Sequence, residues 1–98
     1  MGQPACKLIT DQGEAFCMEA YPVLIGRSPD CQVRLEDETV SMEHAAITYD
    51  DQSGAFVIGD LDSLNGLYIN NQPTRMNFIY DGLRIRLGLT TLTFRETI

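Results

Sequence analysis

Turn-forming residues interrupt this chain every few positions, and no segment between them shows a sustained helical period. The segments between the turns are short and rich in β-branched, aromatic and aliphatic residues, which is typical of strands. Ten segments are expected to be strands: 5–10, 15–19, 23–27, 33–35, 45–49, 55–59, 67–70, 77–80, 83–87 and 91–95. We therefore predict an all-β fold, an antiparallel β-sandwich of about ten to eleven short strands in two sheets with loops gathered at its ends.

Alternation is clearest in 83–87 and 91–95, where apolar residues alternate with polar or basic ones. These two segments should each place one face in the core of the sandwich. Arg84 and Arg86 then belong to a solvated strand face. Hairpin or loop signals lie at 11–13, 50–54, 70–73 and 81–82, because Gly and Asn accept positive φ and Pro presets φ.

The size and charge of the chain exclude several classes of function. Its 98 residues, 44% of them hydrophobic, suffice for one core, so residues 1–98 should form a single domain, which we expect to be part of a longer protein. A net charge of −7 argues against sequence-independent binding to nucleic acid. No apolar run approaches the roughly 20 residues that a membrane-spanning helix needs, so membrane insertion is not expected.

The chain contains three cysteines and one histidine, with no Cys-x-x-Cys pair. This pattern indicates neither a zinc site nor a disulfide framework, and no metal or cofactor is expected. An odd number of cysteines suits a reducing compartment. We expect a cytoplasmic protein, with a nuclear location as an alternative if the source is eukaryotic.

Three short clusters stand where a strand gives way to a loop: Gly26-Arg27, Ser41 to His44, and Ser63 to Gly66. They should place an arginine, a hydroxyl and a carboxamide at one end of the sandwich. These are the groups that hold a phosphate and the peptide backbone beside it. The clusters therefore favour recognition over catalysis.

In their order and spacing these clusters resemble the forkhead-associated (FHA) family, a phosphothreonine-peptide-binding module built as a β-sandwich. The resemblance implies that Arg27 and Ser41 contact the phosphate and that Asn65 binds the peptide backbone. It implies structural support from Gly26, His44 and Gly66. The segments that carry it are 23–31, 40–45, 60–66, 81–82 and 87–88.

The chain departs from the family pattern at two positions. Met42, followed by Glu43, stands where a basic or polar side chain is common, and Leu64 stands where threonine is common. We expect Met42, Ser63 and Leu64 to line the phosphopeptide site, with the backbone N–H groups of Met42 and Leu64 as donors. Modest, salt-sensitive affinity should result, because a phosphate must approach a strongly acidic domain.

We therefore predict a phosphothreonine-dependent peptide-binding module for signalling or assembly. Its partner would be a phosphothreonine-containing protein, the substrate of a Ser/Thr kinase. The alternative is a phosphate-independent FHA-like scaffold within a multiprotein assembly such as bacterial secretion machinery. No P-loop, dinucleotide fingerprint, nucleophile elbow or metal-ligand spacing occurs, so an enzyme is not expected.

Overall fold

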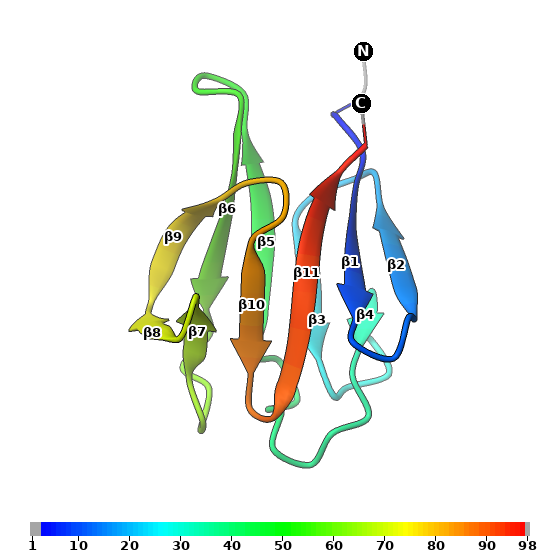
Figure 1. Cartoon of the computed structure of the whole chain (residues 1–98), viewed down its shortest axis with the longest axis vertical. Helices are drawn as coiled ribbons and strands as arrows, with labels where there is room; N and C mark the ends of the chain where they lie inside the picture. Colours follow the sequence, from blue (N-terminus) through cyan, green and yellow to red (C-terminus); the bar gives the residue numbers. More distant parts are fainter. Residues whose placement is uncertain (1–2, 98) are drawn as a thin grey trace.

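Strands make up every regular element in the computed structural model, which describes residues 3–97 (Figure 1). Eleven strands are present, and the predicted all-β sandwich is confirmed. Their bounds are β1 (Cys6–Thr10), β2 (Ala15–Met18), β3 (Val23–Gly26), β4 (Val33–Arg34), β5 (Ala45–Asp50), β6 (Ala55–Asp60), β7 (Leu67–Ile69), β8 (Gln72–Thr74), β9 (Met76–Ile79), β10 (Arg84–Leu87) and β11 (Thr90–Glu96).

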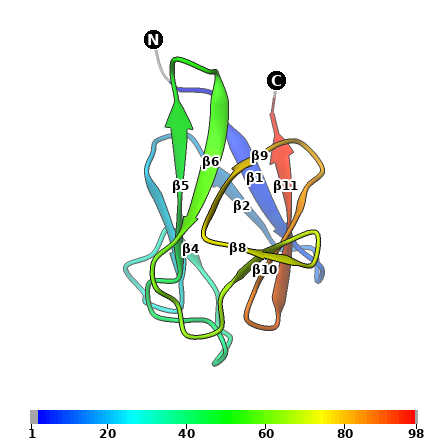
Figure 2. The same cartoon turned by 90° about the vertical axis from the view of Figure 1, so that its left-hand side faces the viewer.

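The strands form two sheets that pack face to face, as the side view in Figure 2 shows. Six strands form one sheet in the order β2-β1-β11-β10-β7-β8. The other five are arranged as β4-β3-β5-β6-β9. We call them the six-stranded and the five-stranded sheet.

Two details of the topology differ from the sequence prediction. Residues Gln72–Thr74 form the edge strand β8, although the sequence there indicated only a turn. An edge strand tolerates Pro73, because its missing N–H is not needed for a second partner. The pair β3–β4 is parallel, joining Ile25 to Val33 and Gly26 to Arg34, whereas every other pair of strands is antiparallel.

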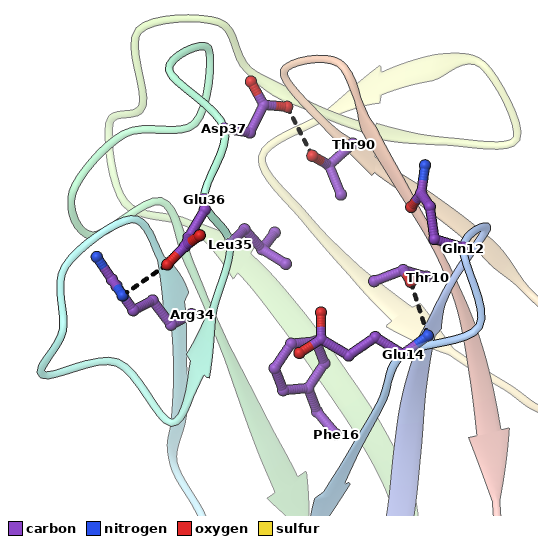
Figure 3. Close-up of a pocket in the computed structure, with 9 residues that line it drawn as sticks. All are labelled: Thr10, Gln12, Glu14, Phe16, Arg34, Leu35, Glu36, Asp37 and Thr90. Carbon is purple, nitrogen blue, oxygen red and sulfur yellow. Dashed lines mark hydrogen bonds and ion pairs between the residues drawn. The ribbon is translucent and has the colours of Figure 1, made fainter.

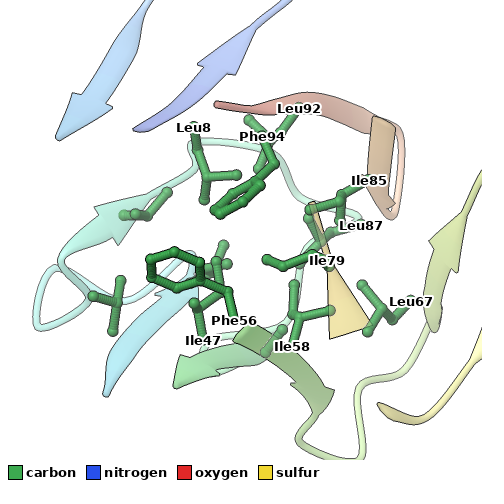
Figure 4. Packing of buried hydrophobic residues seen from close by; sticks show 14 of the residues in the cluster. Leu8, Ile47, Phe56, Ile58, Leu67, Ile79, Ile85, Leu87, Leu92 and Phe94 are labelled. Atoms are coloured by element: carbon green, nitrogen blue, oxygen red, sulfur yellow. The ribbon is translucent and has the colours of Figure 1, made fainter. Parts of the chain in front are cut away.

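The core lies between the sheets and is centred on aromatic rings (Figure 4). Phe56 of β6 packs edge-on against Phe94 of β11, with their ring centroids 5.3 Å apart. Both residues are buried, as are Ile85, Leu87 and Leu92. The inward faces predicted for 83–87 and 91–95 are therefore confirmed, and a period of two explains which side chains enter the core.

The loops that carry the three sequence clusters gather at one end of the sandwich, the lower end in Figure 1. This end, which we call the loop end, holds loops 27–32, 35–44 and 61–66 and the β10–β11 turn. Ala5 and Thr97 lie at the opposite end, where the Thr97 amide donates to the Ala5 carbonyl at 3.2 Å. No helix in residues 3–97 has the length and apolar character needed to cross a bilayer.

Two phenylalanines on neighbouring strands, one buried and one exposed, test which side chains stabilise the core. We expect Phe56→Ala to lower the free energy of unfolding by about 3–5 kcal/mol, because it removes a buried ring and leaves a cavity. Phe78→Ala is the matched control, because Phe78 pairs with Val57 beside Phe56 but is 58% exposed. Urea denaturation measures both changes, and similar losses in the two variants would contradict this core.

Candidate functional site

The buried ring of His44 joins two loops at the loop end. The Ser41 amide donates to His44 Nδ1 at 3.0 Å, and His44 Nε2 lies 2.8 Å from the Gly66 carbonyl oxygen. Because Nδ1 accepts a hydrogen bond, the ring proton is on Nε2, which donates to the Gly66 carbonyl. The histidine therefore acts as a neutral spacer between loops 35–44 and 61–66. This contact joins His44 and Gly66, and their role in supporting a binding site stays a prediction.

Gly26, at the end of β3, brings loop 35–44 close to the strand. A Cβ at this position would overlap the Met42 carbonyl, and the Ser41 carbonyl oxygen would be only 3.0 Å away. The amides of Arg27 and Ser28 bind these two carbonyls, each at 3.0 Å. Glycine is required here for close approach of two backbone segments.

Arg27 follows Gly26 and is exposed at the loop end. Its Nε donates to the Val40 carbonyl at 3.1 Å, which fixes the guanidinium against loop 35–44. No ion pair within residues 3–97 includes Arg27, whereas Arg34, Arg75, Arg84 and Arg95 each pair with a carboxylate. The terminal nitrogens of Arg27 thus remain for an anion from outside the chain.

Ser41 lies across from Leu64, and the Leu64 amide donates to Ser41 Oγ at 3.0 Å. The hydroxyl accepts this bond and keeps its own proton for another acceptor. The Leu64 N–H, expected as a phosphate donor, is thus engaged within the site. The Met42 amide has no hydrogen-bond partner in residues 3–97 and remains a donor. Leu64 is 88% exposed and Met42 is 48% exposed.

Asn65 is exposed next to Leu64 and bonds to loop 35–44. Its Nδ2 donates to the Thr39 carbonyl at 2.7 Å. That contact fixes the carboxamide and leaves Oδ1 and one N–H for a second backbone. Loop 61–66 therefore touches loop 35–44 at three points: His44, Ser41 and Thr39.

The hydroxyl of Ser63 is used inside its own loop. It donates to Asp60 Oδ1 at 2.5 Å and accepts from the Gly66 amide at 3.0 Å. Gly66 has a φ of +84°, which favours glycine. The structure brings Ser63 to the loop end with the other predicted residues, but there it holds the turn that presents Asn65.

The motifs did not reveal one further network, which fixes loop 35–44 against the β10–β11 turn. Asp37 accepts from the Thr39 hydroxyl at 2.7 Å and from the Thr90 hydroxyl at 2.6 Å. The Leu89 amide donates to the Thr39 hydroxyl at 2.8 Å. Gly88, with φ +58°, packs so closely on Thr39 that a Cβ would overlap it. The only sequence signal was the Asp-x-Thr spacing of a side-chain-capped turn.

An acidic groove of about 460 Å³ lies beside this network, between the β1–β2 turn and residues 34–37 (Figure 3). Carboxylates of Glu14, Glu36 and Asp37 line it, and Arg34 pairs with Glu36 at 2.9 Å. The carboxylates outnumber the single arginine, so like-charge repulsion disfavours a phosphate in this groove. Within residues 3–97 no group of three or more His, Cys, Asp or Glu side chains is arranged to hold a metal ion.

Comparison with known proteins places this geometry in a family. The model of the FHA domain family matches residues 23–88, which span all three clusters. The chain belongs to the FHA family. A solved FHA domain from a study of phosphothreonine-dependent FHA interactions superposes on it with a TM-score of 0.87 and 33% identity, covering 96% of this chain and 98% of that one.

Other FHA proteins are similar to this one over most of its length. The FHA domain of FhaA, solved with the intracellular domain of Rv3910, has a TM-score of 0.84 and 35% identity, covering 92% of this chain and 99% of that one. The oxoglutarate dehydrogenase inhibitor of Corynebacterium diphtheriae is 33% identical over 84 residues, 86% of this chain and 57% of that protein. The glycogen accumulation regulator GarA of Mycolicibacterium smegmatis is 33% identical over 82 residues, 84% of this chain and 51% of that protein. This FHA domain thus spans about half the length of the curated relatives it matches.

A pair of glycines tests the close contact under loop 35–44. We expect Gly26→Ala to cost about 1–3 kcal/mol of unfolding free energy, because the new methyl group must displace the Met42 backbone. Gly59→Ala is the control, because its nearest new contact is the Arg75 carbonyl at 3.8 Å, an ordinary separation. Denaturation gives the cost, and amide NMR shifts at Ser41 and Met42 show the displacement. Equal costs and unmoved amides in Gly26→Ala would refute the contact.

The Asp37 network predicts acid sensitivity. Hydrogen bonds from Thr90 and Thr39 lower the pKa of the Asp37 carboxyl from its ordinary value. A lowered pKa stabilises the folded state above the unfolded-state pKa of about 4, and this contribution is lost as pH falls through the folded-state value. We expect the wild-type protein to exceed Asp37→Asn in unfolding free energy at pH 7, with the gap closing towards pH 2.5. Asp51→Asn, at an exposed loop aspartate, is the control. A gap for Asp37→Asn that stays constant across this range would contradict the prediction.

Proposed function

We propose that this FHA domain binds peptides that contain phosphothreonine, with Arg27 and Ser41 on the phosphate and Asn65 on the peptide backbone. The observation that carries the proposal is the arrangement of these three side chains around one contact between loops. Arg27 is free of carboxylates, Ser41 keeps its hydroxyl proton, and Asn65 keeps an acceptor and a donor. All three side chains belong to the loops of the loop end.

The phosphate chemistry follows from these donors. The guanidinium of Arg27 offers two nitrogens in a plane, which suits two phosphate oxygens. The Ser41 hydroxyl and the unpartnered Met42 amide add two neutral donors beside it. A hydrogen bond to a charged group contributes about 1.5–3 kcal/mol, so this set holds a phosphate but needs the peptide for useful affinity.

The peptide would cross the loop end in an extended form. Asn65 bonds its main chain through Oδ1 and one N–H, as a neighbouring strand would. Met42 and Leu64 contribute exposed apolar contacts on either side. Ser63 supports this arrangement from within the turn, through Asp60 and the Gly66 amide.

The relatives support a regulatory role. Curated proteins of this similarity are named as an oxoglutarate dehydrogenase inhibitor and a glycogen accumulation regulator. We infer that residues 1–98 are one binding module of a longer chain, that it is not an enzyme, and that its partner is a substrate of a Ser/Thr kinase. The free thiols of Cys6, Cys17 and Cys31 suit a cytoplasmic location.

A second candidate function is phosphate-independent docking of a protein at the same loops. The observation in its favour is the exposure of Leu64 and Leu89, 88% and 79%, beside Asn65. Large exposed apolar side chains that lie together indicate a protein contact. Binding of an unphosphorylated partner as tightly as its phosphorylated form would favour this candidate.

Two arginine variants with the same change of charge test the proposed function. We expect Arg27→Gln to weaken phosphopeptide binding about 10-fold to 150-fold, because it removes the charged hydrogen bonds to the phosphate. Arg75→Gln is the control, because Arg75 pairs with Asp62 at 2.9 Å and has no part in the proposed contacts. Fluorescence anisotropy with a phosphothreonine peptide library measures both variants. Equal affinities for the phosphorylated and unphosphorylated libraries would refute phosphate recognition.

A further inference from the structure

Basic side chains are concentrated on the outer face of the six-stranded sheet. Four of the seven Lys and Arg residues of the chain alternate there with buried core residues, although the net charge is −7. Lys7 and Arg95 even stand directly opposite each other across β1 and β11, an unfavourable placement for like charges. The four are Lys7 on β1, Arg84 and Arg86 on β10, and Arg95 on β11.

Two of these four cations are paired with carboxylates, whereas Lys7 and Arg86 have no such partner within residues 3–97. Arg84 reaches Asp11 at 3.1 Å, and Arg95 reaches Asp81 at 3.4 Å. No carboxylate within residues 3–97 pairs with Arg86. Its guanidinium lies 4.0 Å from the centroid of the Tyr68 ring, and Nη1 donates to the Gly88 carbonyl at 2.9 Å. The side chain is therefore held in place, while most of its five N–H donors stay unused.

Arg86 also connects the loop end to this face. It lines a groove of about 240 Å³ together with Asn65, Thr39 and Leu89. It lines a second groove, of about 370 Å³, together with Tyr68, Asn70 and Thr91 on the outer face of the sheet. Arg86 thus lines both grooves, and a chain held by Asn65 would meet its guanidinium on the way to the sheet.

We propose that the phosphorylated partner continues from the phosphothreonine as an acidic segment that lies on the outer face of the six-stranded sheet and is bound by Arg86. The inference rests on the proposed function, because the phosphate fixes where the segment starts. Charge complementarity favours an acidic segment, since Arg86 presents an unpaired charge. The Tyr68 ring positions the guanidinium, and the Thr91 hydroxyl offers a further donor.

The direct test compares phosphothreonine peptides that differ only in their flanks. One carries about four glutamates after the phosphothreonine, one carries them before it, and one has glutamines on both sides. We expect one of the two glutamate peptides, the one whose flank reaches Arg86, to bind about threefold to fivefold tighter than the glutamine peptide at low salt, as for an exposed ion pair. This ratio of affinities should shrink as salt rises. In Arg86→Gln this ratio should fall to about one. In Arg75→Gln, which has the same charge, it should persist.

A second measurement separates failure of this proposal from failure of phosphate recognition. An unphosphorylated glutamate peptide is titrated at millimolar concentration into the labelled domain, and the amides of Tyr68, Arg86 and Thr91 are followed by NMR. Shifts at these amides that a glutamine peptide does not produce support the acidic segment even if no phosphopeptide binds. Equal effects of both peptides, or shifts produced only by phosphatidylserine vesicles, would overturn it. So would a glutamate-to-glutamine ratio that is unchanged in Arg86→Gln.

Discussion

A neutral histidine between two loops is the contact on which the loop end depends. His44 accepts from the Ser41 amide and donates to the Gly66 carbonyl, so it sets the separation between loops 35–44 and 61–66. The Leu64 and Asn65 contacts then become possible across the same gap. Because the ring is completely buried, water does not compete for these bonds. A small domain without helices in its described part thereby holds its loops in one arrangement.

The distribution of ion pairs explains how an acidic domain can attract an anion. Four arginines, Arg34, Arg75, Arg84 and Arg95, are paired with carboxylates. Arg27 is fixed instead by a backbone carbonyl, and Arg86 by an aromatic ring and another carbonyl. Neutral partners orient a cation without cancelling its charge. Arg27 and Arg86 therefore each keep an unpaired positive charge on a domain whose net charge is −7.

The sequence predicted features that depend on local patterns better than it predicted contacts between distant segments. Alternation identified the inward residues of β10 and β11, and the clusters around Arg27, Ser41 and Asn65 were correctly expected at one end. Strand β8 was missed because Gln72–Thr74 has the composition of a turn and pairs only at an edge. The engagement of the Leu64 amide and the packing of Gly88 on Thr39 depend on how separate loops meet, which local sequence does not encode.

The hydrogen bond between Thr97 and Ala5 marks the end of the molecule at which attached segments would join it. Both ends of the described chain lie at the end of the sandwich opposite the loop end (Figure 1). Segments joined there would lie at the end opposite the loop end and would not cross the loops. If the proposed site binds a partner, a tether attached at that end would set the partner's local concentration through its length and would leave the loop end unobstructed.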